Sequence, residues 1–289
     1  MQITRALSEH PELFLQEGAR RNLLWFAEYM DPNFPPTPFH KAYYRGLDLF
    51  AKKRIKKLII QAPPQHGKSQ GSSRFLPADM LGLYPDIRIC ICSYAATIAK
   101  DFNRDVKRLI DSESYRAVFP ETVLNGSNVV TVANNYLRNS DVFEIVNHTG
   151  SLRVVGRGGS LTSKTVDVMI YDDLYKDSSE ANSPIIRAAA WDWFTKVAQT
   201  RLHNDSQQLI VFTRWHPDDI IGKIIDSEKV VFVESWADLE NIPGGAWVLV
   251  NFEAIKTGQP TEIDQREAGQ PLWAQRHSLE RLLAQKQLD

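Results

Sequence analysis

The chain has 289 residues, 43% of them hydrophobic, and a formal net charge of −1 at pH 7. This composition is ordinary for a globular protein, and it excludes nucleic-acid binding through an overall basic field, so any such surface must be local. No apolar run reaches membrane-spanning length, and Met1 to Phe14 contains no apolar signal-peptide core. Cys90 and Cys92, the two cysteines, lie in an apolar run that indicates reduced core thiols in a cytosolic protein.

The first segment of the chain, residues 1–56, is predicted to be a helical lead-in. Residues Pro11 to Met30 carry apolar side chains at helical spacing, and a second helix is expected over Phe39 to Lys53 after a proline-rich break. The basic run Lys52 to Lys57 lies near the end of that helix, where the helix dipole favours cations. Contact with DNA is the alternative interpretation of this run.

The stretch Lys57 to Ser69 combines a short apolar strand with a loop that closes on Gly-Lys-Ser. Residues 62–69 match the phosphate-binding pattern G-x-x-x-x-G-K-[ST], with alanine at the first position. A helix over Gly71 to Leu83 is expected to follow, and this context favours the pattern over a chance Gly-Lys-Ser turn. The core predicted to start here runs over residues 57–270.

The residues of this loop have distinct expected roles. Gln65, His66 and Gly67 present backbone N–H groups to phosphate oxygens, and glycine permits the necessary curl. Lys68 reaches the β- and γ-phosphates, and the Ser69 hydroxyl is a ligand for Mg²⁺. The sequence therefore predicts a site for a nucleoside triphosphate with magnesium.

A strand over Ile87 to Tyr94 and a helix over Ala95 to Asp111 come next. The charged residues of this helix suit ordinary i,i+4 pairs on a solvated face. Residues Val142 to Ile145 and Leu152 to Val155 alternate in polarity and predict a hairpin. A glycine-rich loop, Gly156 to Lys164, follows.

The strand predicted over Val166 to Tyr171 ends in Asp172 and Asp173. An apolar strand that ends in acidic residues downstream of a phosphate loop is the Walker B arrangement. Asp172 is expected to hold Mg²⁺, and Asp173 to orient and deprotonate the attacking water. The alternative is that two aspartates merely end a strand, because aspartate favours turns.

Ser183 and Pro184 are typical of a helix start, and the helix is expected to run over Ile185 to Gln199. Its aromatic residues are interpreted as core anchors and not as platforms for nucleic-acid bases: Trp191, Trp193 and Phe194.

A buried strand over Gln208 to Phe212 ends at Thr213 and Arg214, which are placed to sense a γ-phosphate. Pro217 predicts a helix start, with Asp218-Asp219 in its first turn. The dipole favours anions there, so these aspartates are not interpreted as a metal site.

Two further strands, Lys229 to Glu234 and Ala246 to Val250, precede a tail helix over Ser278 to Leu288. Strands that alternate with helices predict an α/β fold with a mainly parallel sheet covered by helices on both faces. The phosphate loop and Asp172-Asp173 then lie at the carboxyl edge of the sheet, where such folds bind nucleotides. The histidines show no zinc-type spacing, so no metal beyond magnesium is expected.

The combination of motifs resembles the large subunit of tailed-bacteriophage terminases, over about residues 35–285. The resemblance is carried by residues 62–69, by Ser93-Tyr-Ala with Lys100 to Arg104, by Gly156 to Asp173, and by the motifs between Trp191 and Asp219. It is specific in its order and combination. The segment Leu272 to Glu280 is similar to the one that closes the ATPase half in this family.

This resemblance implies a P-loop ATPase of the additional-strand, RecA-like type, with ATP and Mg²⁺ as cofactors. It further implies a homo-oligomeric ring that drives double-stranded DNA into a procapsid, with a portal protein and a small terminase subunit as partners in the host bacterial cytoplasm. Family members usually carry a nuclease domain as well. Residues 271–289 are expected to be a linker helix towards a nuclease domain that this chain lacks, so no DNA cleavage is expected from it.

The resemblance also assigns roles to single residues. Asp173 occupies the position where many relatives have a glutamate base, so the water sits closer or another acid such as Glu234 assists. Thr213 corresponds to the coupling motif of the family. His40, in Pro38-Phe39-His40, belongs to a segment that resembles the one lying against adenine.

The arginine finger of the family, which is donated to the ATP of a neighbouring subunit, corresponds to the loop before the Walker B strand. That loop offers Arg157 and Lys164, with Arg201 and Arg214 as outside candidates. Arg157 is the prediction, because a planar guanidinium bridges phosphate oxygens as lysine cannot.

Two alternatives compete with the packaging ATPase. A DEAD-type helicase or other DNA-dependent ATPase also suits Ala62, but it needs a second RecA-like domain, and nothing after Thr213 supplies one. A nucleotide-binding assembly scaffold without turnover is the second alternative, because Asp173 is one methylene shorter than glutamate.

Overall fold

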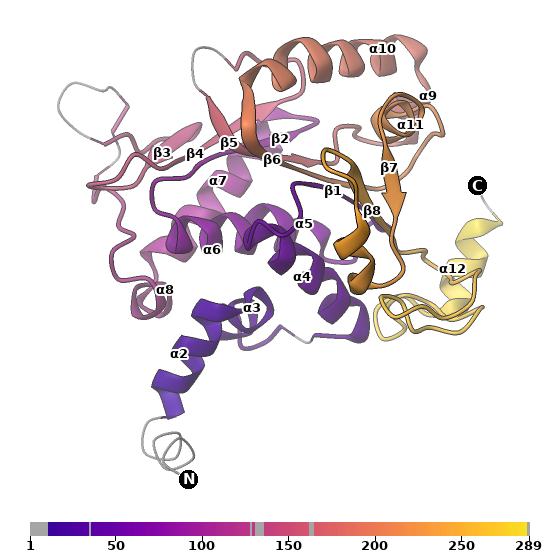
Figure 1. Ribbon diagram of the computed structural model, residues 1–289, viewed down its shortest axis with the longest axis horizontal. Coiled ribbons are helices and arrows are strands. Elements are labelled where there is room, and N and C mark those ends of the chain that lie inside the picture. The colour runs from indigo at the N-terminus through magenta and orange to yellow at the C-terminus, as the bar shows by residue number, and fades with distance from the viewer. Residues whose placement is uncertain (1–10, 35, 128, 131–135, 162–164, 288–289) are drawn as a thin grey trace.

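A computed structural model describes residues 11–34, 36–127, 129–130, 136–161 and 165–287 of the protein. Within these residues, an eight-stranded sheet crosses the molecule in the order β3-β4-β2-β5-β6-β1-β8-β7 (Figure 1). Neighbouring strands pair in parallel, except that β3 is antiparallel to β4. The strands are β1 (Lys57–Gln61), β2 (Arg88–Ser93), β3 (Val142–Glu144), β4 (Ser151–Gly156), β5 (Val166–Asp172), β6 (Leu202–Phe212), β7 (Val230–Phe232) and β8 (Trp247–Asn251).

Helices cover both faces of the sheet, as predicted (Figure 1). One face carries α3 (Leu23–Met30), α4 (Pro38–Ala51), α6 (Leu76–Leu83) and α7 (Ala96–Asp111), and the other carries α10 (Pro184–Trp193) and α11 (Ile220–Ser227). The other α-helices are α2 (Pro11–Arg21), α5 (Lys68–Gln70), α8 (Glu113–Val118), α9 (Ser178–Asn182) and α12 (Leu279–Lys286). Among the described helices, none combines the length and apolar character needed to cross a membrane.

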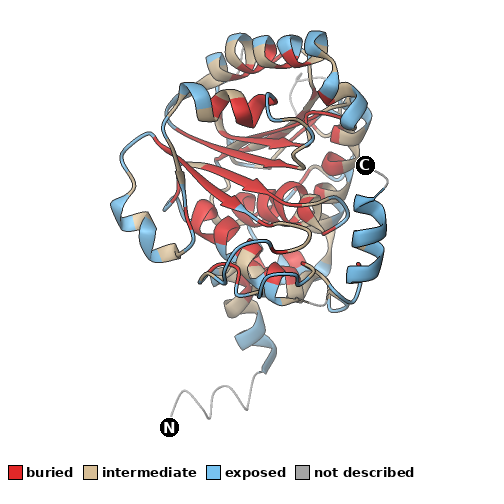
Figure 2. Cartoon of the chain, turned by 90° about the vertical axis from the view of Figure 1, so that its right-hand side faces the viewer, coloured by how far each residue is buried: buried red, intermediate tan, exposed pale blue. Residues whose placement is uncertain are grey.

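Alternate residues of the central strands face two separate hydrophobic cores. In β1, Leu58 and Ile60 belong to the core that includes α4 and α6, whereas Ile59 belongs to the core that includes α10. Both faces of these strands are therefore buried between helical layers (Figure 2). Burial on both faces explains why they form near-continuous apolar runs in the sequence.

The prediction of a single helix over Pro11 to Met30 is wrong, because the chain breaks at Asn22 into α2 and α3. Asn22 is extended (φ −148°), and its side-chain oxygen accepts the N–H groups of Leu24 at 3.0 Å and Trp25 at 3.1 Å. This is an N-cap that satisfies donors at the start of α3.

The helix predicted to start at Pro217 instead begins at Ile220. Asp219 is the N-cap of α11 and accepts the N–H of Gly222 at 3.0 Å. The capping aspartate therefore stands before the first turn, where its carboxylate satisfies a free donor of the helix.

The start of α10 agrees with the prediction. Ser183 is its N-cap, accepting the N–H of Ile186 at 3.4 Å, and Pro184 occupies the first turn. Trp193 and Phe194 are buried in the core on this face of the sheet, as expected of anchors.

Two predicted helices contain π-helical turns. The helix after the phosphate loop starts earlier than predicted, at Lys68, and passes through a π turn over Gly71–Phe75 into α6. The helix α10 continues through a π turn over Phe194–Ala198 and a 3₁₀ turn over Gln199–Arg201 into β6.

The predicted hairpin is confirmed, since β3 and β4 pair with Phe143 opposite Leu152. Residues 162–164 of the following glycine-rich loop lie outside the described residues, so Lys164 is not placed.

The helices α3 and α4 pack into the same core as the sheet. Phe26 of α3 is fully buried, and its ring lies 6.3 Å from that of Phe75, 6.0 Å from that of Tyr115 and 5.9 Å from that of Phe119. These aromatic contacts join α3 to the helix behind the phosphate loop.

We expect Phe26→Ala to lower the free energy of unfolding by about 3–5 kcal/mol, because it leaves a cavity among these rings. Ile185→Ala, at a side chain that is 81% exposed in α10, is the matched control and should change stability by less than about 0.5 kcal/mol. Denaturant unfolding measures both values. Equal effects of the two substitutions would show that α3 is not part of the cooperative core.

Candidate active site

The loop after β1 curls through a left-handed glycine. Gly67 has φ 78° and ψ 14° and is the N-cap residue of α5, and a Cβ there would lie 3.4 Å from His40 Nε2. Glycine adopts this backbone conformation without steric strain. The strand β1 therefore delivers Lys68 and Ser69 directly at the start of a helix, as the sequence pattern predicts.

The Lys68 side chain is only 4% exposed and folds back onto its own loop. Its ammonium group donates to the carbonyl oxygens of Ala62 at 3.0 Å and Pro63 at 3.1 Å, and to the Thr213 hydroxyl. The Asp173 carboxylate lies 3.8 Å away. Burial lowers the pKa of Lys68, and the nearby carboxylates oppose that shift.

Asp172, the last residue of β5, is 1% exposed and accepts hydrogen bonds from three serines. Ser69 donates to Oδ1 at 3.0 Å, while Ser72, at 3.4 Å, and Ser73 donate to Oδ2. Burial, and then the neighbouring Asp173 carboxylate, raise the pKa of Asp172 to about 6. Strand and helix thus hold this carboxylate directly beside the Ser69 hydroxyl.

Asp173 has a left-handed backbone with φ 40°. Its N–H donates to Val211 O at 3.1 Å, its carbonyl accepts the Tyr94 N–H at 3.1 Å, and its Oδ1 accepts the Thr213 N–H at 2.8 Å. Burial raises the pKa of this carboxyl. Aspartate is several-fold enriched in left-handed conformations, which gives a physical reason for aspartate here.

His40 lies on the other side of the loop, in the first turn of α4. Thr37 caps this helix, and its hydroxyl is 2.8 Å from His40 Nδ1. The imidazole ring lies 4.5 Å from the Trp273 ring and 5.1 Å from the Phe34 ring. Burial lowers the pKa of His40 to about 4, so it is neutral at pH 7.

A cavity of about 490 Å³ extends from Lys68 and Asp173 to the His40 side of the phosphate loop. Its volume is ordinary for a small-molecule site. At one end it is polar and at the other largely aromatic. The residues that line it include Phe34, His40, Gly67, Lys68, Ser69, Asp173, Trp273 and Arg276.

Phe34, Trp273 and Arg276 were not predicted as site residues. The Arg276 guanidinium lies 5.2 Å from the Trp273 ring. The sequence indicated only that Leu272 to Glu280 closes this half of the family's fold, because the position of a distant aromatic side chain depends on the tertiary structure.

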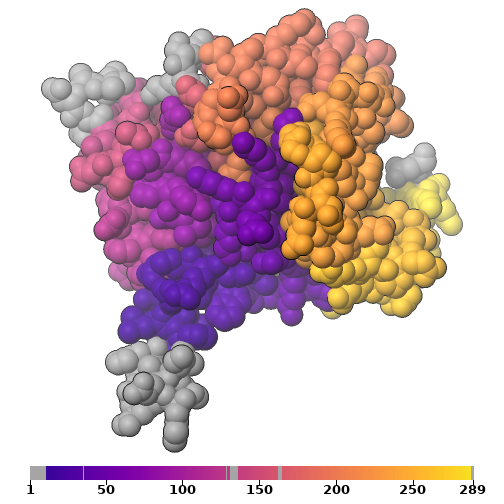
Figure 3. Space-filling model, in the orientation of Figure 1, coloured from indigo at the N-terminus to yellow at the C-terminus, as the bar shows by residue number. Residues whose placement is uncertain are grey.

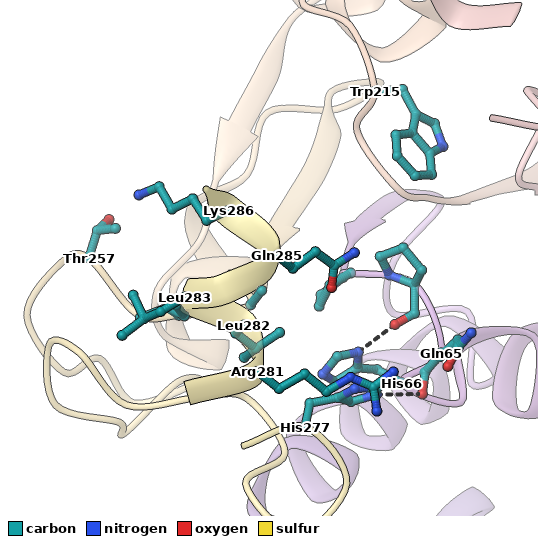
Figure 4. A pocket seen from close by; sticks show the side chains of 14 residues that line it. Gln65, His66, Trp215, Thr257, His277, Arg281, Leu282, Leu283, Gln285 and Lys286 are labelled. Atoms are coloured by element: carbon teal, nitrogen blue, oxygen red, sulfur yellow. Dashed lines mark hydrogen bonds between the residues drawn. The ribbon is translucent and has the colours of Figure 1, made fainter. Parts of the chain in front are cut away.

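The other side of the phosphate loop borders a second cavity, between the loop and α12 (Figure 4). His66 is 2% exposed, and its ring stacks on that of His277 with centroids 4.4 Å apart. His277 Nε2 is 3.3 Å from Gln65 O. The His66 side chain therefore faces the C-terminal segment, so its predicted contact with phosphate rests on its backbone N–H. This second cavity contains neither Lys68 nor the carboxylates, which is why we assign the site to the first.

In the space-filling view, the C-terminal segment lies at one corner of the molecule, beside the segment that carries β7 and β8 (Figure 3). Residues Ile255 and Pro271 pair there in an isolated antiparallel bridge.

The structure does not bring Arg157 to this cavity. Its guanidinium donates to Leu174 O at 2.6 Å and pairs with Glu180 at 3.0 Å. Arg214 is likewise engaged elsewhere, 2.9 Å from Asp219. The arginine-finger role of Arg157 stays a prediction.

Glu234 follows β7, and β8, β1 and β6 lie between that strand and β5. Asp173, in contrast, lines the cavity, and its carboxylate lies 3.8 Å from the Lys68 ammonium group.

The oxygen donors beside Lys68 suit a magnesium ion. The described residues contain no group of three or more His, Cys, Asp or Glu side chains arranged as a metal centre. Mg²⁺ does not require one, because it binds through one or two carboxylates together with substrate phosphates and waters. Ser69 Oγ and Asp172 Oδ1, 3.0 Å apart, fit that donor set.

A family model described as terminase large subunit, T4likevirus-type, N-terminal, matches residues 59–284. Among curated proteins, none matches the chain.

Several solved structures are similar to this chain. The HK97 bacteriophage large terminase is 12% identical with a TM-score of 0.50, covering 89% of this chain and 49% of that one. A variant of the Thermus phage P74-26 large terminase ATPase domain is 13% identical with a TM-score of 0.44, covering 88% and 94%. A DEAD-box protein from Methanococcus jannaschii is 13% identical with a TM-score of 0.41, covering 78% of this chain and 52% of that one.

The chain spans about half the length of the HK97 large terminase. The predicted P-loop NTPase fold and the predicted family are both confirmed. Because the family model covers most of its length, the chain belongs to the T4likevirus-type terminase large subunits and corresponds to their N-terminal region.

Proposed function

We propose that this chain binds ATP with Mg²⁺ and hydrolyses it. One observation carries the proposal: residues at or beyond the carboxyl ends of β1, β5 and β6, three neighbouring parallel strands, meet beside one cavity. These residues are Lys68, Ser69, Asp172, Asp173 and Thr213. The carboxyl edge of a parallel sheet is where such folds bind nucleotides.

In this proposal the phosphate loop binds the triphosphate. The N–H groups of Gln65, His66 and Gly67 face its oxygens, and the Lys68 ammonium group exchanges the Ala62 and Pro63 carbonyls for the β- and γ-phosphates. Ser69 and Asp172 hold Mg²⁺, which when bound neutralises charge on the phosphoryl oxygens.

Asp173 is the proposed general base for the attacking water. Burial raises its pKa, which favours proton uptake over that of an exposed aspartate, and the Thr213 N–H fixes its carboxylate at 2.8 Å. Thr213 also accepts a hydrogen bond from Lys68 through its hydroxyl. A change at the phosphates therefore reaches β6 through Thr213, which supports its proposed coupling role.

The aromatic end of the cavity is the proposed position of the adenine base. His40 and Phe34 supply one wall and Trp273 another. Aromatic rings and an adenine ring pack favourably in stacked or edge-to-face geometry.

Family membership supports a further proposal, that ATP turnover drives double-stranded DNA into a procapsid. The working unit is then a homo-oligomeric ring in the host bacterial cytoplasm, with a portal protein and a small terminase subunit as partners. Two basic stretches are candidates for DNA contact, the Lys52 to Lys57 run and the Arg104 to Arg108 part of α7. Both carry ion pairs, Lys52 with Asp48 and Arg104 with Asp101.

Phosphate release from ATP tests the hydrolysis proposal. We expect Lys68→Ala and Asp173→Asn to lower turnover by more than about 100-fold, because each removes a charge at the transferred phosphoryl group or its water. Asp192 at the end of α10 and Lys196 in the π turn after it form an exposed pair. Lys196→Ala and Asp192→Asn are the matched controls and should retain activity. Specific activity should rise with protein concentration if a neighbouring subunit completes the site.

Hydrolysis at the wild-type rate by Asp173→Asn would exclude Asp173 as the base. If the wild-type protein binds ATP but releases no phosphate at any concentration, with or without double-stranded DNA, the nucleotide-binding scaffold replaces the ATPase.

The buried Asp172 gives a prediction about stability and pH. Because its pKa is raised to about 6 in the folded protein, its stabilising effect is present at low pH and is lost as the pH rises through 6. Without nucleotide and magnesium, we expect Asp172→Asn to raise the free energy of unfolding by about 1–3 kcal/mol more at pH 7.5 than at pH 4. Denaturant unfolding at both pH values measures this, with Asp192→Asn as the exposed control. An equal effect at both pH values would show that Asp172 does not take up the proton.

A further inference from the structure

The loop that follows the catalytic carboxylates is held by one guanidinium group. Arg157 directly follows β4, and its backbone N–H donates to Ser93 O at 2.7 Å. In the sheet, β2 lies between β4 and β5, so the Arg157 side chain crosses the end of β2 to reach the loop after β5. There its Nη1 donates to Leu174 O at 2.6 Å. The side chain is only 17% exposed.

The same guanidinium fixes the far end of that loop. Its Nη1 lies 3.0 Å from Glu180 Oε2 on α9, and this carboxylate oxygen also accepts the Lys176 N–H at 3.1 Å. Between these points, the buried Tyr175 ring lies 5.7 Å from the guanidinium carbon. Arg157 thus has a partner at each end of the loop and an aromatic ring between them.

Leu174 directly follows Asp173, whose left-handed backbone with φ 40° needs support. Residues in sparsely populated backbone conformations persist only where their surroundings over-determine them. The peptide groups of Asp173 are held by hydrogen bonds to Val211 in β6 and to Tyr94, the residue after β2. The Arg157 contact holds the next carbonyl, which completes the support on the side where the chain leaves the sheet.

We propose that Arg157 and Glu180 act within one subunit as a positioning pair that holds Asp173 in its catalytic geometry. This inference rests on the proposed role of Asp173 in hydrolysis. It competes with the prediction that Arg157 is an arginine finger for a neighbouring subunit. To serve as an arginine finger, the guanidinium has to give up its contacts with the Leu174 carbonyl, the Glu180 carboxylate and the Tyr175 ring.

Steady-state kinetics separate the two roles. For a positioning pair, Arg157→Ala and Glu180→Ala each lower kcat about 10-fold, the size of effect typical of losing a hydrogen bond to a charged group. The KM for ATP changes little, because the phosphate loop is intact. The double variant is no slower than Arg157→Ala, because the two residues act as one unit. Arg157→Lys keeps part of the activity, since an ammonium group can still bond Leu174 O or Glu180.

A finger predicts the opposite pattern: Glu180→Ala retains or gains activity while Arg157→Ala and Arg157→Lys are both inactive. That result would overturn the proposal. Thermal unfolding and ATP binding of each variant show whether it is folded. If Arg157→Ala is unfolded, Glu180→Gln and Arg157→Lys decide the question by the same comparison.

Mixing variants provides a second test. Arg157→Ala and Lys68→Ala, mixed in equal amounts, show no more activity than the average of the two separate variants if Arg157 acts within its own subunit. A trans finger instead restores roughly a quarter of wild-type activity. In a random head-to-tail ring, this is the share of interfaces at which one subunit has an intact Lys68 and its neighbour an intact Arg157. Wild type diluted with Lys68→Ala is the control for subunit mixing. Full activity of Lys68→Ala or Asp173→Asn alone would mean that the proposed function itself fails, whatever the role of Arg157.

Discussion

Two neighbouring carboxylates at the end of a buried strand need hydrogen-bond donors, and the elements around them are arranged to supply those donors. A charge taken out of water is tolerated only where donors or opposite charges surround it. Asp172 has three serine hydroxyls from the helix that starts at Lys68, and Asp173 has the Thr213 N–H and the Lys68 ammonium group. These donors meet only if β1 and β6 are in register with β5, and the parallel pairing of these strands fixes that register.

The cavity beside these carboxylates is built from segments far apart in the chain. Its polar end comes from the loop after β1 and from the end of β5, at the middle of the sheet. Its aromatic end comes from Phe34 just before α4 and from Trp273 near the C-terminal helix. The sheet therefore sets the geometry of the phosphate end, while the base end depends on how the two flanking segments pack against it.

Features that depend on local sequence could be predicted from it. The strands followed from apolar runs, and the phosphate loop and the Asp172-Asp173 pair from short motifs at strand ends. The break at Asn22 shows where helical periodicity hides a boundary, because the apolar spacing continues across the capping residue. Near Asp219 the signal from Pro217 placed the helix start too early, because the capping role of Asp219 depends on the local backbone. The wall formed by Trp273 and the pairing of Arg157 with Glu180 could not be predicted. Many aromatic and acidic residues are equivalent in sequence, and only the tertiary structure selects one.

The phosphate loop also separates two cavities. Pro64 and Gln65 line both the cavity beside Lys68 and the one beside α12, and the Gln65 carbonyl oxygen lies 3.3 Å from His277 (Figure 4). The loop and the C-terminal segment are therefore in direct contact, so a movement of either one changes the surroundings of the other. Coupling free energies are reciprocal, so if bound phosphate displaces this segment, a mechanical load on the segment alters phosphate affinity by the same free energy. In that case, a force applied near the C-terminal helix changes the binding constant for phosphate at the loop.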